Sequence, residues 1–406
     1  MQFAHRLLLR WQQSFGRYPW WAIPALCWTI MVVIVVVRVS IHPLKSTVYP
    51  TFAIAGQHFA HGESVYGHMD AIFRYTPIWA GLFSLGNDLP FLFPHLLWRL
   101  LNLVVLIWGA HRFQLYFLPH WNSLQRALWW TLMLPFCQGS FNNAQANLLL
   151  LGFLLAALSY FAQKRYWHSA LCQAVAISMK VYPVALSLLL VLIEPVGLLV
   201  PLLVSVGILG LAPYALQSMS YINGEYRNWV YFCFGDLRVD KDISDSNRDV
   251  WMLIRLTAWP IDYRVYQFLQ AGTALALAGW TWTHRSTLRS GIMSRTTLLM
   301  LFNFAIAWML ILGPASESST YALVAPLAAY SAVILLTMQT TFLERLLILL
   351  SFTLMILAHL GSAFTYTSML HSYGIHPIGA FLLAITVHLL LRSPDRQGLP
   401  SLSASR

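Results

Sequence analysis

The chain has 406 residues, of which 58% are hydrophobic and only 10% are charged. Soluble proteins carry about 25% charged residues, so this composition excludes a soluble globular protein. The net charge of +11 would suit nucleic-acid binding, but the basic residues are divided among short loops, where they orient a membrane protein. We therefore expect an all-α polytopic integral membrane protein that binds membrane lipids and no nucleic acid.

The N-terminal residues 1–21 are basic and aromatic, and they lack a short apolar core followed by a small-residue cleavage site. This pattern predicts a retained cytoplasmic segment and not a signal peptide. Arg6, Arg10 and Arg17 precede the first apolar run, Pro24–Ser40. The positive-inside rule places these arginines in the cytoplasm and the next segment, residues 41–90, outside.

Residues 41–90 form the first predicted extracytoplasmic loop. Phe52, Ala55 and Phe59 recur at helical spacing and Gly62 follows, which predicts a helix lying at the membrane interface and ending at that glycine. Pro77 can open a second short helix. His58, His61 and His68 are scattered, as surface histidines usually are, so we predict no metal site and no cofactor.

Apolar runs continue along the chain and give about 11 to 13 transmembrane or re-entrant helices in total. The further candidates are Phe91–Ala110, Arg126–Phe141, Ala146–Phe161, a pair across Ser169–Ile193, Val196–Leu216, Tyr263–Trp282, Thr296–Leu312, Thr320–Thr337, Arg345–Leu360 and His376–Leu391.

The remaining basic residues fix which loops are cytoplasmic. Lys164 and Arg165 share one tight loop, residues 285–295 carry three arginines, and the tail 392–406 carries three more. The rule places all of these inside, so residues 217–249 and 313–319 face outward. We treat residues 1–406 as one membrane domain, because no repeat or soluble module interrupts the pattern.

Lys180 stands in the middle of the apolar run Ser169–Ile193. A lysine at the bilayer centre costs about 2.5–3.5 kcal/mol on insertion scales. Each flank has about a dozen residues, too few to cross about 30 Å as a helix, so we predict two short helices that meet at residues 180–183, where Pro183 breaks the helix. Lys180 then faces a cavity that opens outward; the alternative is a lysine snorkelling at a helix end.

Three amide side chains precede the lysine segment. Asn143, Gln145 and Asn147 stand where the Ala146–Phe161 run begins, and we expect Asn143 and Asn147 to share a helix face. Buried amides either bind a hydroxyl-rich ligand or tie helices together, and we favour the ligand.

Acidic residues are concentrated in the outward segments. Residues 221–249 mix acids with arginines and a lysine, which predicts a solvated, mobile segment. Glu317 lies closest to a span end in the C-terminal half. It could act as a base, bind sugar hydroxyls, or only cap the helix that begins near Thr320.

Four stretches, in this order, resemble glycosyltransferase family 87 of the GT-C superfamily. They are VYPTFAIAGQHFAHGESVYG, FRYTPIWAGLFSL, NNAQANLLLLGFLLAAL with AISMKVYPVALSLLL, and GPASESSTYALVAPLAAYS. The resemblance implies a GT-C-like fold and transfer of a sugar from a polyprenyl-phosphate donor on the outer face. It also implies a substrate-binding role for Tyr49, His58, Tyr66, Arg74, Tyr75, Asn143, Gln145, Asn147, Lys180 and Tyr182.

Such a transfer needs a base for the acceptor hydroxyl and a cation for the phosphate leaving group. Lys180 is the expected phosphate partner, together with Arg74. The family's usual aspartate would fall at about Val48 or Tyr49, where no acid stands, and Ser319 and Thr320 occupy the place of its late histidine. Glu317 is therefore the expected base, with Glu63 and Asp70 as substitutes.

Three hypotheses remain open at this stage. The first is a hexosyltransferase of the plasma membrane, mannose being one candidate sugar, that acts on a lipid or glycan acceptor. The second is a transporter of a lipid-linked solute, which should show two related halves with broken helices. The third is a catalytically inactive GT-C-like protein that binds a glycolipid.

Overall fold

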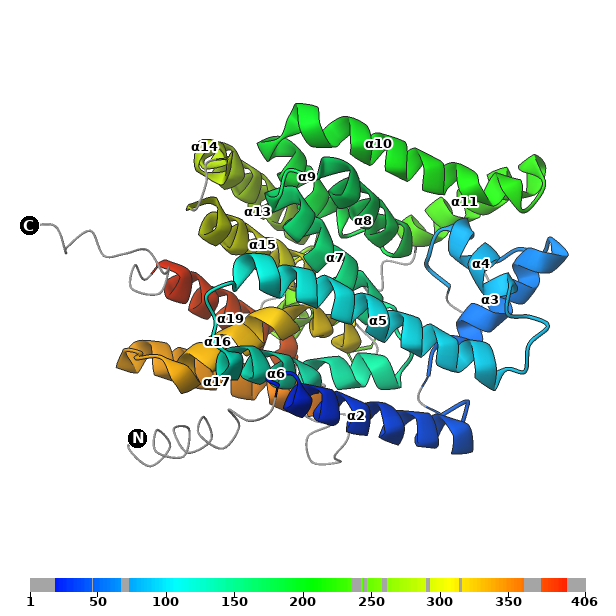
Figure 1. The fold of residues 1–406 in the computed structure, drawn as a ribbon. Coiled ribbons are helices and arrows are strands. Elements are labelled where there is room, and N and C mark those ends of the chain that lie inside the picture. Colours follow the sequence, from blue (N-terminus) through cyan, green and yellow to red (C-terminus); the bar gives the residue numbers. More distant parts are fainter. Residues whose placement is uncertain are drawn as a thin grey trace, which may run out of the picture.

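A computed structural model describes residues 19–45, 47–66, 73–235, 242–243, 247–257, 261–289, 293–313, 316–360 and 374–392 (Figure 1). In these ranges every regular element is a helix. The first half contains α2 (Ala22–Ile41), α3 (Tyr49–His61), α4 (Pro77–Ser84), α5 (Leu92–Phe117), α6 (Ser123–Asn142), α7 (Asn147–Ala162), α8 (Tyr166–Met179), α9 (Val184–Ile193), α10 (Pro195–Leu211) and η1 (Ala212–Ala215). The second half contains α11 (Met219–Gly235), α12 (Val250–Arg255), α13 (Tyr263–Thr283), α14 (Arg285–Arg289), α15 (Met293–Ile311), η2 (Ser318–Val324), α16 (Ala325–Thr337), α17 (Phe342–Leu360) and α19 (Ile375–Arg392).

The predicted all-α, multi-pass membrane architecture is confirmed. Six helices in the described ranges are long and apolar enough to cross a membrane, and α7, α9 and α15 add shorter apolar segments. Helices at the periphery expose apolar side chains, such as Val33 and Ile34 on α2 and Leu203 and Ile208 on α10. Exposed aliphatic faces of this kind suit contact with lipid tails.

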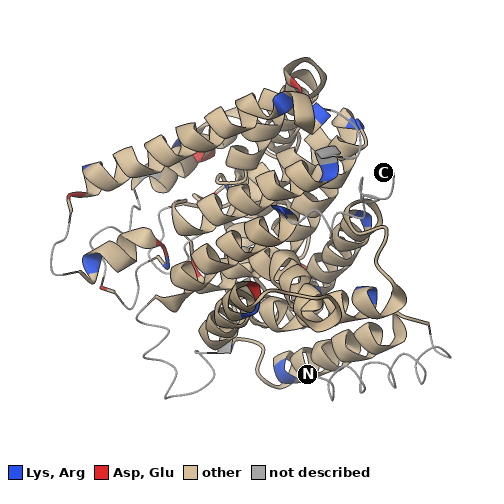
Figure 2. Ribbon diagram, turned by 90° about the vertical axis from the view of Figure 1, so that its left-hand side faces the viewer, with Lys and Arg blue, Asp and Glu red and all other residues tan. Residues whose placement is uncertain are grey.

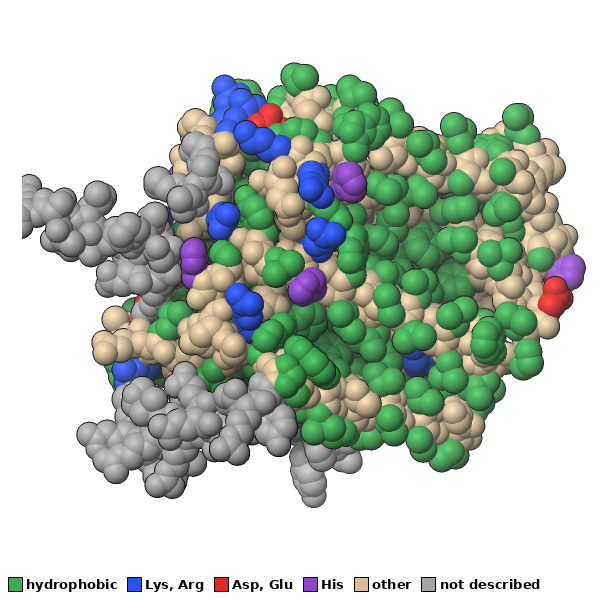
Figure 3. Space-filling model, viewed as in Figure 1, with side chains coloured by type: hydrophobic (Ala, Val, Ile, Leu, Met, Phe, Trp, Pro, Cys, Tyr) green, Lys and Arg blue, Asp and Glu red, His purple; other side chains and the backbone are tan. Residues whose placement is uncertain are grey.

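The two ends of the bundle differ in charge. Charged residues are sparse along the ribbon (Figure 2), and basic side chains gather over the end at which α2 begins and α19 ends, beyond a broad apolar middle (Figure 3). Helices α3, α4 and α11 lie at the opposite end (Figure 1). From the positive-inside rule we expect the end with α3 and α4 to be the extracytoplasmic one.

Helix α7 is buried on nearly all sides, as expected for a helix that is apolar all round. Its Gly152 faces Gly109 of α5 so closely that a Cβ added at Gly109 would lie 1.9 Å from the Gly152 carbonyl oxygen. Small residues allow this close backbone approach between membrane helices. The packing of α5 on α7 holds the start of α7 in a fixed place, which matters for the site below.

The predicted pair of short helices across Ser169–Ile193 is confirmed as α8 and α9. The two meet at residues 180–183, with Lys180 in an extended conformation directly after α8. Their far ends return to the same side: the Tyr166 ring packs on Gly197 just after α9, and Arg289 donates to the Ile193 carbonyl at 2.7 Å. The pair therefore enters and leaves the bundle at its basic end.

The interfacial helices of the first loop are also confirmed. Helix α3 ends at Gly62, whose φ of +70° is the left-handed conformation that glycine adopts freely. Pro77 opens α4. The two helices pack closely, since a Cβ at Gly56 would lie 2.7 Å from the Phe83 carbonyl carbon.

Two predictions about local structure are wrong. Residues 219–235, predicted to be a solvated segment, form helix α11, and Glu225 on it is only 3% exposed. Asn143 and Asn147 do not share a helix face, because α6 ends at Asn142 and α7 begins at Asn147. Ala144 between them has a φ of +55°, which reverses the chain.

Candidate active site

The turn between α6 and α7 carries the three amide residues and lies beside the start of α3. The turn closes through the Gln145 N–H, which donates to Ser140 at 3.1 Å, and the Trp98 indole donates to the Ala144 carbonyl at 2.8 Å. The Asn143 carbonyl is used by the backbone, accepting the Val48 N–H at 3.0 Å. The turn is thus tied to both α5 and the start of the first loop.

A chain of polar contacts links Lys180 to Glu317 through this turn. The Lys180 ammonium donates to Asn147 Oδ1 at 2.8 Å. Asn147 Nδ2 lies 3.5 Å from Gln145 Oε1, and Gln145 Nε2 donates to Glu317 Oε2 at 3.1 Å. The structure therefore brings together a cation, two amides and an acid that are distant in the sequence.

Lys180 is half-buried and held inside the protein. Its ammonium lies 5.8 Å from the centre of the Tyr182 ring. The preceding turn of α8 is fixed by α4: Thr76 donates from both its N–H and its hydroxyl to the Ser178 carbonyl, and Trp79 donates to the Ser178 hydroxyl. The hydrogen bond to Asn147 rules out a lysine that only snorkels to the surface.

Glu317 does not cap the helix that follows it. It occupies the N-cap position of η2, but its side chain makes no capping hydrogen bond and instead accepts from Gln145. Its charge acts on two phenols, Tyr75 and Tyr182. Burial raises the pKa of Tyr75, and the nearby Glu317 carboxylate raises it further. Glu317 therefore stands at the N-cap position without a capping hydrogen bond, and its carboxylate belongs to the same chain of contacts as Lys180.

The Arg74–Tyr75 segment runs between Glu317 and helix α11. The Tyr75 carbonyl accepts from the Tyr66 hydroxyl at 2.6 Å, and the Arg74 carbonyl accepts from Trp229 of α11 at 3.1 Å. The Arg74 guanidinium lies 5.8 Å from the centre of the Phe232 ring. Tyr75 thus lies beside Glu317, whereas Arg74 packs on α11.

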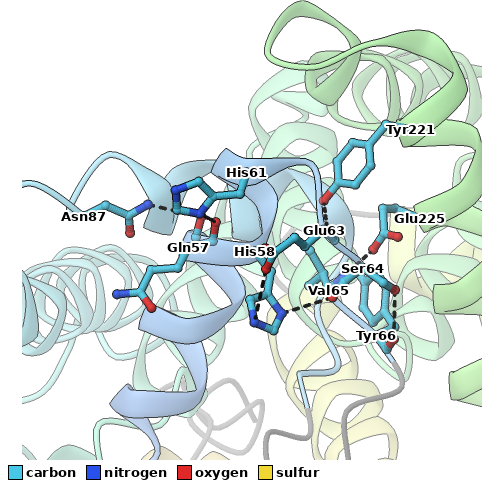
Figure 4. A network of polar contacts seen from close by, with 11 residues as sticks. Gln57, His58, His61, Glu63, Ser64, Val65, Tyr66, Asn87, Tyr221 and Glu225 are labelled. Atoms are coloured by element: carbon cyan, nitrogen blue, oxygen red, sulfur yellow. Dashed lines mark hydrogen bonds and ion pairs between the residues drawn. The ribbon is translucent and has the colours of Figure 1, made fainter.

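His58 and Glu63 belong to a network of polar contacts between α3, the residues that follow it and α11 (Figure 4). The two side chains are 3.8 Å apart, and Glu63 is 61% exposed. The buried Glu225 of α11 accepts the Val65 N–H at 2.8 Å, and Tyr221 donates to the Glu63 carbonyl. These contacts fasten the first loop to α11, and Tyr66, whose carbonyl accepts from Ser64, ties the network to the Tyr75 carbonyl.

Of the remaining predicted residues, Tyr49 packs in an aromatic core. Tyr49 is 3% exposed and stacks on the His95 ring with 4.5 Å between centroids, within an aromatic core that includes Phe52 and Phe83. Asp70 lies outside the described residues. Asp70 therefore stays a sequence-based candidate, and Tyr49 does not reach the Lys180 group through its described contacts.

Sequence reasoning missed two contributors to the site. Ser319 accepts from Asn147 at 3.3 Å, so the position expected to hold a histidine does contact the amide group. Arg248, before α12, donates its N–H to the Ser316 carbonyl at 2.7 Å and lays that segment beside Glu317. The neighbouring Asp249 is the N-cap of α12, and burial raises its pKa to about 6, although the N–H of Met252 partly opposes the shift. In the sequence, only the mixed charge of residues 221–249 pointed to the contact between Arg248 and Ser316.

The geometry suits chemistry on a polar, anionic substrate. An ammonium can bind a phosphate through a charge-assisted hydrogen bond. A half-buried carboxylate within the same group can take a proton from a hydroxyl. The Tyr182 hydroxyl and Thr320 Oγ1 are buried and have no hydrogen-bond partner within the described ranges.

A family profile matches part of this chain, and one solved structure is similar to it. The sequence profile of glycosyltransferase family 87 matches residues 73–314. No curated protein sequence matches the chain. Among solved structures, the crystal structure of ArnT from Cupriavidus metallidurans bound to undecaprenyl phosphate is similar, with a TM-score of 0.40 and 17% identity over 90% of this chain and 77% of ArnT. The profile match contains Lys180 and the amide turn and ends three residues before Glu317.

Proposed function

This chain belongs to glycosyltransferase family 87, and we propose that it transfers a hexose from a polyprenyl-phosphate-linked donor to a hydroxyl of a lipid or glycan acceptor. We place the reaction at the extracytoplasmic face of the plasma membrane. Mannose is the first sugar to test. The observation that carries the proposal is the set of contacts that joins Lys180 to Glu317 through Asn147 and Gln145.

Lys180 is the proposed partner of the donor phosphate. It stands at the bend between α8 and α9, and α4 packs beside that bend, at the end of the bundle that the positive-inside rule puts outside. As the sugar leaves, negative charge grows on the phosphate oxygen, and a fixed cation stabilises this charge most in the transition state. Asn147 holds the ammonium in place before the donor arrives.

Glu317 is the proposed general base. In the reaction, the acceptor oxygen forms a bond to C1 of the sugar as the bond between C1 and the phosphate oxygen breaks, with inversion at C1. The acceptor proton moves to the Glu317 carboxylate, and polyprenyl phosphate leaves with the bonding electrons. Tyr182, Thr320 and the amides of the α6–α7 turn would bind sugar hydroxyls, because hydroxyls both donate and accept hydrogen bonds.

Reconstitution tests the proposal directly. We expect the purified chain in proteoliposomes to convert a radiolabelled polyprenyl-phosphate hexose, with mannose and glucose compared, into free polyprenyl phosphate and a labelled lipid or glycan. The labelled product should form when donor is supplied to the compartment facing α3 and α4. Donor that stays intact with every hexose and with total membrane lipid as acceptor would contradict the proposed transfer.

A transporter would give a different result in the same vesicles. A labelled donor would move between leaflets with its bond between sugar and phosphate intact. Intact donor in the opposite leaflet, without release of polyprenyl phosphate, would therefore favour transport over transfer.

A further inference from the structure

Helices α5 and α8 flank a groove on the outside of the bundle, and α7 lies between them. Figure 3 shows an apolar hollow in this surface, with basic and histidine side chains along its edge nearest the basic end. A small apolar cluster, separate from the main core, joins the three helices here: Ala156, Ala157, Tyr160 and Cys172, with Trp108 and Phe153 packed against them. Val104 of α5 and Leu171 of α8 are each 53% exposed. The groove is therefore apolar and open to the surrounding lipid.

Arg112 and His168 contact one tyrosine ring at the basic end of this groove. The Arg112 guanidinium of α5 lies 5.4 Å from the centre of the Tyr160 ring, and the His168 ring of α8 lies 5.1 Å from it. Tyr160 is only 6% exposed, whereas Arg112 is half-buried and His168 is exposed. Contact with an aromatic face holds a guanidinium in place and leaves the N–H donors at its edges accessible.

Arg112 makes no hydrogen bond and no ion pair within the part of the chain that the structure describes. Other arginines at the basic end are used by the fold. Arg126 donates to two backbone carbonyls at 2.8 and 3.0 Å, and Arg289 pairs with Glu194 at 3.2 Å. Because a guanidinium presents several N–H donors and stays charged, Arg112 keeps its full capacity to bind an anion.

The charges around Arg112 favour an anionic ligand. No acidic residue stands between Asp88 and Glu194, so α5, α6, α7, α8 and α9 contain none. Lys164 is exposed at the α7–α8 turn, where its φ of +60° is uncommon for a residue other than glycine. That turn is fastened to Tyr160, whose carbonyl accepts a backbone N–H of the turn at 2.9 Å. The end of the groove therefore carries positive charge that these helices do not offset.

An anionic phospholipid matches both parts of this surface. Its acyl chains suit the apolar groove, and its phosphate can accept charge-assisted hydrogen bonds from an arginine. Basic pockets between helices at the cytoplasmic side of membrane proteins bind lipid headgroups in this way, and the positive-inside rule predicts that the basic end is cytoplasmic. A soluble anion would use the arginine but not the groove.

We propose that Arg112, His168 and Lys164 bind the headgroup of an anionic phospholipid at the basic end of the groove between α5 and α8. The Arg112 guanidinium donates to the phosphate oxygens, His168 donates from its ring to a neighbouring ester oxygen, and Lys164 adds a second positive charge. One acyl chain follows the groove past Leu171. The site lies at the opposite end of α8 from Lys180, so this inference does not depend on the transfer reaction.

Binding of phosphatidylglycerol to the purified full chain tests the site. Native mass spectrometry in neutral detergent counts bound lipid for the wild type, Arg112→Met, His168→Leu and the control Arg392→Met. We expect the Kd of one phosphatidylglycerol to rise about 10- to 100-fold in Arg112→Met, which loses hydrogen bonds to a charged group, and about 2- to 10-fold in His168→Leu. Arg392 is exposed at the end of α19, so its variant should bind like the wild type.

Diacylglycerol separates the headgroup from the acyl chains. It fills the groove with the same chains but has no phosphate, so it should bind weakly and equally to all four proteins. A preference of the wild type over Arg112→Met for diacylglycerol would contradict a phosphate contact at Arg112.

Three further results would overturn the proposal. If Arg112→Met and His168→Leu both keep wild-type affinity for phosphatidylglycerol, these side chains do not bind the headgroup. If inorganic phosphate raises the thermal unfolding temperature of the wild type as much as phosphatidylglycerol does, the site binds a free anion. If the spectra show a lipid-free dimer that Arg112→Met dissociates, the groove is an interface between two copies. His168 is exposed, so His168→Leu keeps the test decisive if Arg112→Met does not fold.

Discussion

Replacing Lys180 with methionine is expected to lower kcat/KM for sugar transfer by about 10²- to 10³-fold, the loss typical when a group that stabilises developing negative charge is removed. Methionine keeps most of the length of the side chain and removes the charge together with the hydrogen bond to Asn147. Because Lys180 donates to Asn147 and faces the same group as Glu317, its ammonium is the cation available to the leaving phosphate. Initial rates in proteoliposomes with radiolabelled donor give the measurement.

A matched variant controls for general loss of charge on α8. Arg165 precedes the same helix at its other end and is exposed, so Arg165→Met should transfer sugar at the wild-type rate. Lys180→Arg, which keeps the charge but changes its geometry, should retain more activity than Lys180→Met. Turnover by a folded Lys180→Met protein at the wild-type rate would remove Lys180 from the reaction.

Replacing Glu317 with glutamine is expected to lower kcat by about 10²- to 10⁴-fold with a much smaller change in KM, because general-base catalysis contributes about that much. Glutamine can still accept the hydrogen bond from Gln145, so the site should keep its shape. Initial rates in proteoliposomes at varied acceptor concentration give kcat and KM for both proteins.

Glu63 provides the comparison for the base. Its carboxylate is exposed and lies in the network around His58, so Glu63→Gln should transfer sugar like the wild type. Loss of activity in Glu63→Gln together with unchanged turnover in Glu317→Gln would move the base to the first loop.

Much of the fold followed from length, charge and proline. The apolar run around Lys180 was too short on either side to cross the bilayer, and together with the helix break at Pro183 this predicted the hairpin of α8 and α9. Gly62 and Pro77 marked the end of α3 and the start of α4, because their backbone preferences act locally. Features governed by local rules could be predicted from the sequence.

Features governed by tertiary contact could not. Helix α11 contains Glu225, which looks solvated in the sequence and is buried because it accepts the Val65 N–H from the first loop. The chain reverses at Ala144, which has a positive φ. Glycine is the usual residue in that conformation, and because none stands there, the sequence predicted that Asn143 and Asn147 lie on one helix. Arg38 and Arg99 lie in apolar runs of separate helices, and only packing brings both to Asn142.

The proposed site itself could be predicted in part. Lys180, Glu317 and the three amides were selected from unusual polarity near span ends, and four of these five residues meet in one chain of contacts. Asn143 is the exception, because its described contact is made by its backbone carbonyl. The polar residues of an apolar chain could therefore be selected as site candidates from the sequence. Which of them contact one another could only be seen in the structure.

The most direct test is a cryo-EM map of the full chain with polyprenyl phosphate bound in lipid nanodiscs. We predict a phosphate oxygen about 2.7–2.9 Å from the Lys180 ammonium, the usual length of a charge-assisted hydrogen bond, on the side of the α6–α7 turn that faces Glu317. Phosphate density at the basic end near Lys164, or Lys180 bonded only to protein while the lipid occupies another site, would contradict this account.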